Sequence, residues 1–284
     1  MMAPFLITYT LFIIVPIVIA IIFSFTDFNL LNIESLRFTG IDNYIRMFLD
    51  DDAFITALRN TLIFAVITGP LSYFACLIFA WLINELNPKI RALLTFVFYA
   101  PTISGMVYVM WAYIFSGDMY GLLNYILMET GMITEPIQWL TDPKYMLGVI
   151  IFVQLWMSLG TSFLSFIAGL QNVDKQLYEA AAVDGVKNRF QELIYVTLPS
   201  MGPQLLFGAV MQISAAFSVS SICMTLAGFP SVDNAALTIV THIYDHGNVH
   251  FEMGYACAMS VFLFVFIMII NQIIQSIIKK YADV

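Results

Sequence analysis

The sequence predicts an all-α integral membrane protein built as a bundle of six transmembrane helices. Apolar residues make up 61% of the chain, charged residues only 11%, and the mean hydropathy is +0.88. A soluble domain carries about 25% charged residues, so most of this chain is unsuited to contact with water. Six segments reach the ~20 residues that an apolar helix needs to cross a bilayer. These segments are residues 4–25, 60–83, 92–115, 146–168, 204–226 and 254–278.

Every charged residue lies in a loop or a tail, because none of the six segments contains Asp, Glu, Lys, Arg or His. Proton relays and ion-coupled carriers place ionisable side chains inside the membrane. Many secondary carriers also contain internal repeats, and we find none in this sequence. These observations argue against a stand-alone secondary carrier or channel. They predict that the energy for any transport comes from outside this chain.

The distribution of basic residues predicts that both termini are cytoplasmic. In that orientation seven of the eleven Lys and Arg residues are on the inner side, namely Lys89, Arg91, Lys175, Lys187, Arg189, Lys279 and Lys280. The first segment begins almost at the initiator, without a preceding basic region or a small-residue cleavage site. We therefore expect it to remain as an anchor and not to be removed as a signal peptide.

Two local patterns refine the predicted elements. Asp50, Asp51 and Asp52 precede a short helical stretch. Acidic side chains suit the positive end of a helix dipole, whereas a single acidic triplet lacks the spaced oxygens of a calcium site. In the third span, Pro101 is followed by Gly105. This pair predicts a kink in that span.

Three histidines recur at every fourth residue, which raises the question of a metal site. They are His242, His246 and His250. The pair Gly247-Asn248 is expected to break a helix between the last two. Only the first two histidines then share a helix face, and two ligands do not make a site. We therefore expect exposed loop histidines and no bound metal.

The segment between the fourth and fifth spans, residues 171–201, is much longer than a helix hairpin needs. Asp174 can cap a helix that runs to about Val183, and Gly185 suits the left-handed position after a helix end. Three side chains of this helix lie close to one face, namely Leu177, Ala180 and Ala181. The extra length predicts a binding partner at this inner loop.

A second helix is predicted in the same loop. Asn188 and Gln191 resemble a capping box at its start, and Leu198-Pro199 is expected to stop it before the next span. Its apolar residues follow helical spacing and are Phe190, Leu193, Ile194 and Thr197. The apolar faces of the two helices have two possible roles. They either pack back on the bundle or fill a groove in a cytoplasmic subunit.

The run Glu-Ala-Ala-Ala-Val-Asp-Gly at residues 179–185, followed by Leu198-Pro199, resembles a known family. It is similar to the Glu-Ala-Ala loop of permease subunits in binding-protein-dependent ABC importers. The flanking motifs resemble the carbohydrate branch, in particular its first permease subunit as found in maltose- and glycerol-phosphate-type systems. The chain ends soon after the last span, which favours that assignment. The flanking motifs are Ser24-Phe25-Thr26-Asp27, Gly40-Ile41-Asp42-Asn43-Tyr44, Asn60-Thr61-Leu62, Trp139-Leu140, Ala168-Gly169-Leu170-Gln171 and Gly254-Tyr255-Ala256.

The resemblance implies a type I importer fold, with residues 1–284 as one transmembrane permease domain. It also implies that the loop at about 171–201 docks into a separate ATPase and couples it to the translocation path. The residues expected to make this contact are Glu179, Ala180, Ala181, Asp184, Gly185, Phe190, Leu198 and Pro199.

The expected partners follow from the same resemblance. They are a second homologous permease, two cytoplasmic ATPase subunits and an extracellular sugar-binding protein, in a bacterial or archaeal cytoplasmic membrane and without nucleic acid. The chain has no Gly-x-x-x-x-Gly-Lys-Ser/Thr, so we expect no enzyme activity of its own and no cofactor. ATP and Mg would be bound by the ATPase subunits. A permease for a non-sugar solute remains the alternative.

Two spans carry matching polar stripes that define a candidate substrate path. The path residues are Gln154, Trp156, Ser158, Thr161, Ser214, Ser218 and Ser221, with Ser165 and Thr225 continuing the two stripes. Such residues either line a hydrated path or let helices pack closely, and the sequence leaves both interpretations open. Trp156 and Tyr99 are candidates for stacking on a sugar, although rings of this kind also anchor helices at membrane interfaces.

Overall fold

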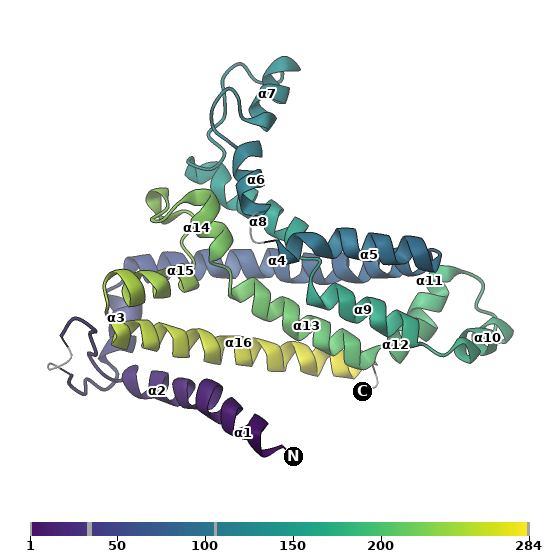
Figure 1. Cartoon of the computed structure of the whole chain (residues 1–284), viewed down its shortest axis with the longest axis horizontal. Helices are drawn as coiled ribbons and strands as arrows, with labels where there is room; N and C mark the ends of the chain where they lie inside the picture. The colour runs from purple at the N-terminus through teal and green to yellow at the C-terminus, as the bar shows by residue number, and fades with distance from the viewer. Residues whose placement is uncertain (1, 33–35, 105–106, 283–284) are drawn as a thin grey trace. The chain divides into compact units, whose positions relative to one another are not determined.

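The computed structural model describes residues 2–32, 36–104 and 107–282. Within these ranges the only strand-like pairing is an isolated antiparallel bridge between Thr26 and Phe38. The chain forms two compact units, one from residues 1–62 and 219–268 and the other from residues 63–218 and 269–284. Figure 1 shows the helices. The prediction of a single domain over residues 1–284 stays a prediction.

The described residues contain five helices that are long and apolar enough to cross a membrane, or six when a bent pair of helices is counted as one span. The all-α, six-span prediction is confirmed. The five are Ala3–Phe23 (α1 Ala3–Tyr9, η1 Thr10–Ile14, α2 Val15–Phe23), α4 Asp52–Asn84, the pair α8 Pro143–Met157 and α9 Thr161–Asn172, the pair α13 Gly202–Phe217 and α14 Ser221–Ala227, and α16 Met253–Ala282.

The bent pair corresponds to the predicted third span. It consists of α5 Pro88–Ile103 and α6 Val107–Ile114, which meet at 83°. Pro101 lies inside α5, close to its end. Gly105, the other residue of the predicted kink, lies outside the described residues. The remaining elements are α3 Asp42–Leu49, α7 Leu122–Glu129, α10 Lys175–Val183, α11 Arg189–Glu192, η3 Leu193–Thr197, α12 Leu198–Ser200, η4 Val232–Asn234, α15 Ile239–Tyr244 and η5 Asp245–Val249.

Two of the helical stretches loosen into a π-helical turn just before a proline. The amide of Val15 bonds to the carbonyl of Thr10, ahead of Pro16. The amide of Leu198 bonds in the same i to i−5 manner to Leu193, ahead of Pro199. A proline ring clashes with the carbonyl four residues earlier in a regular α-helix. The wider turn shifts that carbonyl, so the helical path continues through each proline.

In the second unit, α9 packs closely against α13. Gly208 lets the ring of Phe166 approach so closely that a Cβ there would collide with it. The hydroxyl of Ser162 donates to the carbonyl of Gly208 at 3.2 Å. Cys76 on α4 and Phe163 are fully buried in the same core. This seam of small residues holds the helices that line the cavity described below.

In the first unit, aromatic rings and one amide join the start of α4 to the later helices. Phe54 contacts Phe48 and Phe262 edge to face, with ring centroids 5.6 and 5.7 Å apart. The amide of Asn60 donates to the backbone carbonyls of Asn234, Ala235 and Leu237. A single buried side chain therefore satisfies three carbonyls of the segment that leads into α15.

Candidate functional site

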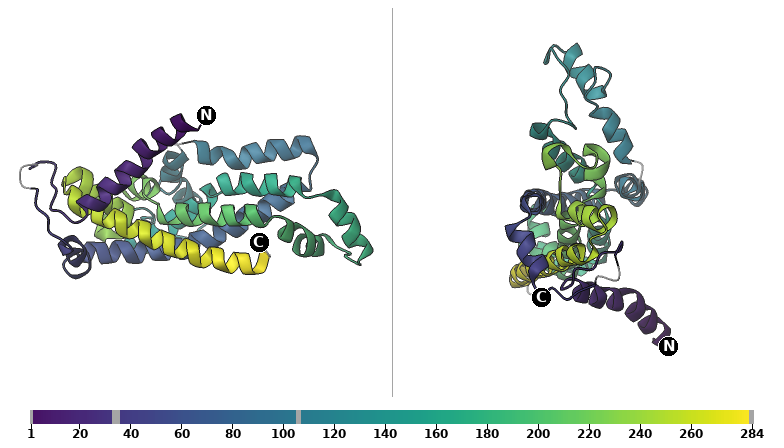
Figure 2. Two further views of the ribbon diagram at one scale, coloured as in Figure 1. Left: turned by 90° about the horizontal axis from the view of Figure 1, so that it is seen from below. Right: turned by 90° about the vertical axis from the view of Figure 1, so that its left-hand side faces the viewer.

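The inner loop folds as two short helical stretches, as the sequence predicts. Asp174 caps α10, accepting the amide of Gln176 at 3.0 Å, and Asn188 caps α11, accepting the amide of Gln191 at 2.8 Å. Gly185 follows α10 with φ +97°. That conformation is open to glycine and strained for other residues. In Figures 1 and 2, α10 projects beyond the ends of α9 and α13 of the same unit.

The apolar residues of the loop divide between packed and exposed positions. Thr197 is buried and Leu193 is half-buried. Phe190 is 62% exposed, and Leu177 and Ile194 are exposed as well. Glu179, Ala180, Asp184 and Gly185 are exposed, while Ala181 is half-buried. Phe190 therefore does not pack back on the bundle, which was one of the two predicted roles of these residues. The exposed surface is what a docking site for another protein requires.

Polar contacts hold the base of the loop to the membrane helices of its unit. The guanidinium of Arg189 lies 3.6 Å from Glu85 at the end of α4 and 2.7 Å from Glu192. The hydrogen bond with Glu192, and then the charge of Glu85, raise the pKa of Arg189. The hydroxyls of Tyr178 and Thr197 lie 2.9 Å apart, so α10 and η3 are also linked to each other.

The second helix ends one residue after the predicted stop at Leu198-Pro199. Its helical path runs through η3 and α12 as far as Ser200, and α13 begins at Gly202. The π-turn before Pro199 shifts the carbonyl that the proline ring would meet in a regular α-helix. Leu198 is half-buried and Pro199 exposed. Leu198-Pro199 therefore marks both a change of helix type and the last turn before the next span.

Most of the predicted path residues line one cavity in the second unit. Its volume is about 490 Å³, within the range of small-molecule sites. Five of the seven predicted path residues are in its lining, namely Gln154, Ser158, Thr161, Ser214 and Ser218. The cavity lies where α8 stops before α9 begins and where α13 ends. The breaks leave backbone groups without helical partners beside the polar side chains.

One of those backbone groups is bonded by a residue that the sequence did not indicate. The amide of Gln212 on α13 donates to the carbonyl of Ser158 at 3.2 Å, and the thiol of Cys76 donates to the same carbonyl at 3.4 Å. Gln212 is buried and also lines the cavity. The sequence does contain a signal for this role, because Gln212 lies between Met211 and Ile213 in an apolar run. A buried side-chain amide in such a run requires a hydrogen-bond partner.

The structure separates the other candidates from this cavity. Trp156 is not part of the lining, is 44% exposed and packs on Trp111 with ring centroids 5.3 Å apart. Tyr99 lines a different cavity of about 480 Å³ together with Arg91 and Gln171. Ser221 belongs to the other compact unit. The cavity adds lining residues that were not predicted, including Thr102, Tyr108 and Met157.

The prediction of exposed loop histidines is wrong for two of the three. His242 lies on α15 and is 3% exposed, while His246 follows one turn later in η5 and is half-buried. The helical path continues through Gly247-Asn248 as a π-turn instead of breaking. His250 is exposed, as predicted. Burial opposes ionisation of Asp51, but hydrogen bonds from Tyr255 and His242 hold its pKa below the usual value.

Residues 77–282 match the family described as binding-protein-dependent transport system inner membrane component. This match covers the inner loop and the cavity. The chain belongs to this family. It is a membrane-spanning component of a binding-protein-dependent transport system, and the resemblance carried by residues 179–185 is confirmed at the family level.

Relatives within the family span nearly the same length. The chain is 31% identical to the probable ABC transporter permease protein YesP of Bacillus subtilis, over 96% of this chain and 87% of that relative. It is 31% identical to the lactose transport system permease protein LacF of Rhizobium radiobacter, over 86% and 80%. It is 29% identical to the arabinooligosaccharides transport system permease protein AraP of Bacillus subtilis, over 95% and 85%.

Two solved structures have the same fold as this permease-family chain. One is a bacterial ABC transporter for alginate import, and the other is the alginate transporter in complex with an alginate-bound periplasmic protein. Each matches with a TM-score of 0.80 and 23% identity. The alignments cover 98–99% of this chain and 93% of the other. The type I importer fold implied by the resemblance is thus confirmed.

Proposed function

We propose that this chain is the membrane-spanning subunit of an ATP-driven importer for sugars or oligosaccharides. The observation that carries the proposal is the cavity of about 490 Å³, lined by amide and hydroxyl groups at the helix breaks. Such groups can donate hydrogen bonds to sugar hydroxyls and accept hydrogen bonds from them. The sugar-transporting relatives LacF and AraP support the same substrate class.

The lining also favours a neutral sugar over an anionic solute. Among the described residues that form it, none is Arg, Lys or His. A relative of 29% identity is named as a permease for sn-glycerol-3-phosphate, so a phosphorylated solute is the natural alternative. Phosphate binding draws on cationic side chains or free backbone amides. The polar groups that this wall supplies are carbonyl, amide and hydroxyl groups instead.

The partners of the complex complete the proposal. A second homologous permease encloses the path, two ATPase subunits bind ATP and Mg and dock at residues 171–201, and an extracellular sugar-binding protein delivers the cargo. The chain itself catalyses no hydrolysis. Both termini lie on the cytoplasmic side of a bacterial or archaeal cytoplasmic membrane. The exposed face that contains Phe190 supports the ATPase contact.

Substitutions at two glutamines of the cavity distinguish a role in sugar transport from a role in helix packing. Gln154→Leu should lower sugar uptake per assembled complex roughly two- to tenfold, since a net hydrogen bond is worth about 0.5–1.5 kcal/mol. Complex yield should stay unchanged, because no hydrogen bond joins the Gln154 side chain to another helix in the described part of the chain. Uptake in proteoliposomes and yield after gel filtration are measured side by side.

Gln212→Leu is the matched comparison, because it removes the amide that bonds the carbonyl of Ser158. We expect lower yield and a lower melting temperature. Trp156→Phe, on the same helix as Gln154 but outside the cavity, should change neither readout. Unchanged uptake with Gln154→Leu, or a loss with Trp156→Phe, would contradict the proposed path.

A further inference from the structure

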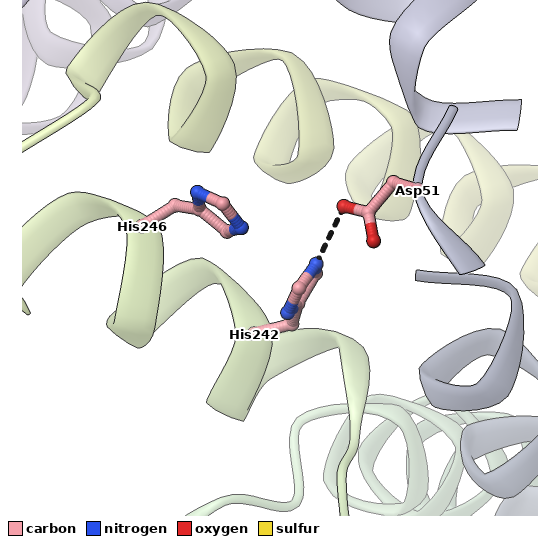
Figure 3. A group of neighbouring side chains, drawn as sticks. All are labelled: Asp51, His242 and His246. Atoms are coloured by element: carbon pink, nitrogen blue, oxygen red, sulfur yellow. Dashed lines mark hydrogen bonds and ion pairs between the residues drawn. The ribbon is translucent and has the colours of Figure 1, made fainter. Parts of the chain in front are cut away.

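Three side chains that can bind a metal converge outside the membrane spans. Asp51 precedes α4, while His242 and His246 lie one turn apart on α15 and η5 (Figure 3). One potential ligand atom from each lies within 4.8 Å of the others. All three residues belong to the first compact unit, yet His242 is 191 positions away from Asp51 in the sequence. The fold, not the local sequence, brings them together.

The carboxylate of Asp51 is oriented by the groups around it. One oxygen, Oδ1, accepts the amide of Phe54 at 2.9 Å and caps α4. The other, Oδ2, lies 2.8 Å from Nε2 of His242 and accepts the hydroxyl of Tyr255 at 2.6 Å. Oδ2 therefore faces the histidines in a fixed direction. It can exchange the histidine proton for a metal ion while keeping the bond from Tyr255.

A second carboxylate orients the ring of His246. Its Nδ1 lies 2.9 Å from Oε2 of Glu252, and Glu252 is itself paired with Arg46 at 3.0 Å. When Nδ1 donates to a carboxylate, the lone pair is left on Nε2. Metal-binding histidines are held in this way, by a carboxylate on the nitrogen opposite the metal. In Figure 3 the ring of His246 is turned toward the other two residues.

The tautomer of His242 can change when a metal ion replaces its bond to Asp51. Without a metal, Nε2 donates to the carboxylate of Asp51 at 2.8 Å, and this bond keeps the proton on Nε2. Nδ1 is buried and has no hydrogen-bond partner among the described residues, so no contact prevents the proton from moving there. When the proton moves from Nε2 to Nδ1, Nε2 gains the lone pair that a metal ligand needs.

We propose that Asp51, His242 and His246 bind one zinc ion, with water or another small ligand in the fourth position. Two imidazoles and one carboxylate suit Zn²⁺ rather than Ca²⁺ or Mg²⁺, which prefer oxygen ligands. Zinc holds nitrogen and oxygen ligands at about 2.0–2.2 Å, so tetrahedral ligand atoms lie ~3.3 Å apart. The pair at 2.8 Å opens slightly, and His246 approaches by a side-chain rotation. The ion then clamps the start of α4 to α15.

Zinc content and metal-dependent stability test the site. The full chain, purified in detergent with the subunits it carries, is stripped with a chelator, incubated with Zn²⁺ and passed over a desalting column. Mass spectrometry of the metal should find one zinc per copy of this chain. Zn²⁺ should raise the melting temperature, because a ligand that binds only the folded state stabilises it. Co²⁺ in place of zinc should show the intense visible absorption of a tetrahedral site.

His246→Ala should abolish zinc retention and the rise in melting temperature. His250→Ala is the matched control, since His250 is exposed and its nearest carboxylate, on Asp245, lies 3.6 Å away. It should retain the zinc. Glu252→Gln should weaken zinc binding about 10- to 100-fold, as removal of a ligand-orienting carboxylate does. If His246→Ala fails to fold, His242→Gln replaces it.

Two results would overturn the site. One is the absence of retained zinc in the wild-type chain. The other is equal retention by the wild type and a folded His246→Ala or His242→Gln variant, which would mean that zinc binds elsewhere.

Discussion

At the scale of single residues, the sequence predicted the role of a residue where that role depends only on the local backbone conformation. Gly185 adopts φ +97°, as a residue that follows a helix end should. Gln212 and His242 were not predicted in their roles, because their partners come from distant segments. The residue bonded to His242, Asp51, is 191 positions away in the chain. Hydrogen-bond partners of this kind are created by tertiary packing, which residue spacing within one helix does not reveal.

Gly185→Asp should uncouple ATP hydrolysis from transport without preventing membrane insertion. An aspartate at this φ costs roughly 1–2 kcal/mol, and it tilts α10 relative to the helix that follows. The charge also faces the surface that contacts the ATPase in the proposed complex. Substrate-stimulated ATPase activity in proteoliposomes is the measurement, and we expect most of the stimulation to be lost.

Gly131→Asp is the control for backbone strain alone. Gly131 has φ +70°, and at either glycine a Cβ would meet no other atom within 4 Å. It lies just after α7 and outside the inner loop. Stimulation should be retained with Gly131→Asp. Normal stimulation with Gly185→Asp would argue against a coupling role for the loop.

At the scale of elements, hydropathy and capping patterns located the helices but not their interruptions. The inner-loop helices begin at Asp174 and Asn188 because capping depends on neighbours in sequence. The break between Met157 and Thr161 lies inside a largely apolar stretch. Hydropathy averaged over a sequence window therefore indicates one continuous span there. Bonds from α4 and α13 to the carbonyl of Ser158 support that break. The cavity at the break was therefore predicted by its polar residues and not by its shape.

Phe190→Ala should weaken binding of the ATPase subunits while leaving the fold of this chain intact. The side chain is 62% exposed, so its removal creates no cavity in the chain. An aromatic anchor at a protein interface contributes about 2 kcal/mol or more, equivalent to a loss of affinity of about thirtyfold or more. Co-purification of the ATPase subunits at increasing dilution measures this loss.

Phe38→Ala is the control, because it removes another exposed phenylalanine side chain. Phe38 is 80% exposed and lies in the segment between α2 and α3, far from the inner loop in sequence. It should not change ATPase retention. Equal retention by the Phe190→Ala variant and the wild type would remove Phe190 from the interface.

At the scale of the whole molecule, composition predicted the number of spans because transfer of the backbone into lipid requires long apolar helices. It did not predict how far α4 extends, from Asp52 to Asn84, since the first turns of that helix carry polar residues. The first span is the most exposed of the five long apolar helices, with 0% of its apolar window buried. Lipid or a neighbouring subunit must cover that surface.

The purified chain alone should hydrolyse no ATP and should be poorly stable without a partner permease. Its open cavity and its uncovered first span leave polar groups and apolar surface without neighbours. Phosphate release and size-exclusion profiles, with and without co-expressed subunits, measure both properties. A monodisperse homo-oligomer that transports sugar would contradict this expectation.

The hydroxyl groups that line the cavity bear on the speed of transport. A Ser or Thr hydroxyl rotates between donating and accepting without any backbone movement. Each such contact contributes about 0.5–1.5 kcal/mol, only one to three times the thermal energy. In the proposed path, a sugar that passes Thr161, Ser214 and Ser218 would exchange one weak hydrogen bond for the next and meet no deep energy minimum. Such a wall would bind weakly and release quickly, so discrimination between sugars would have to take place before the cargo enters the membrane.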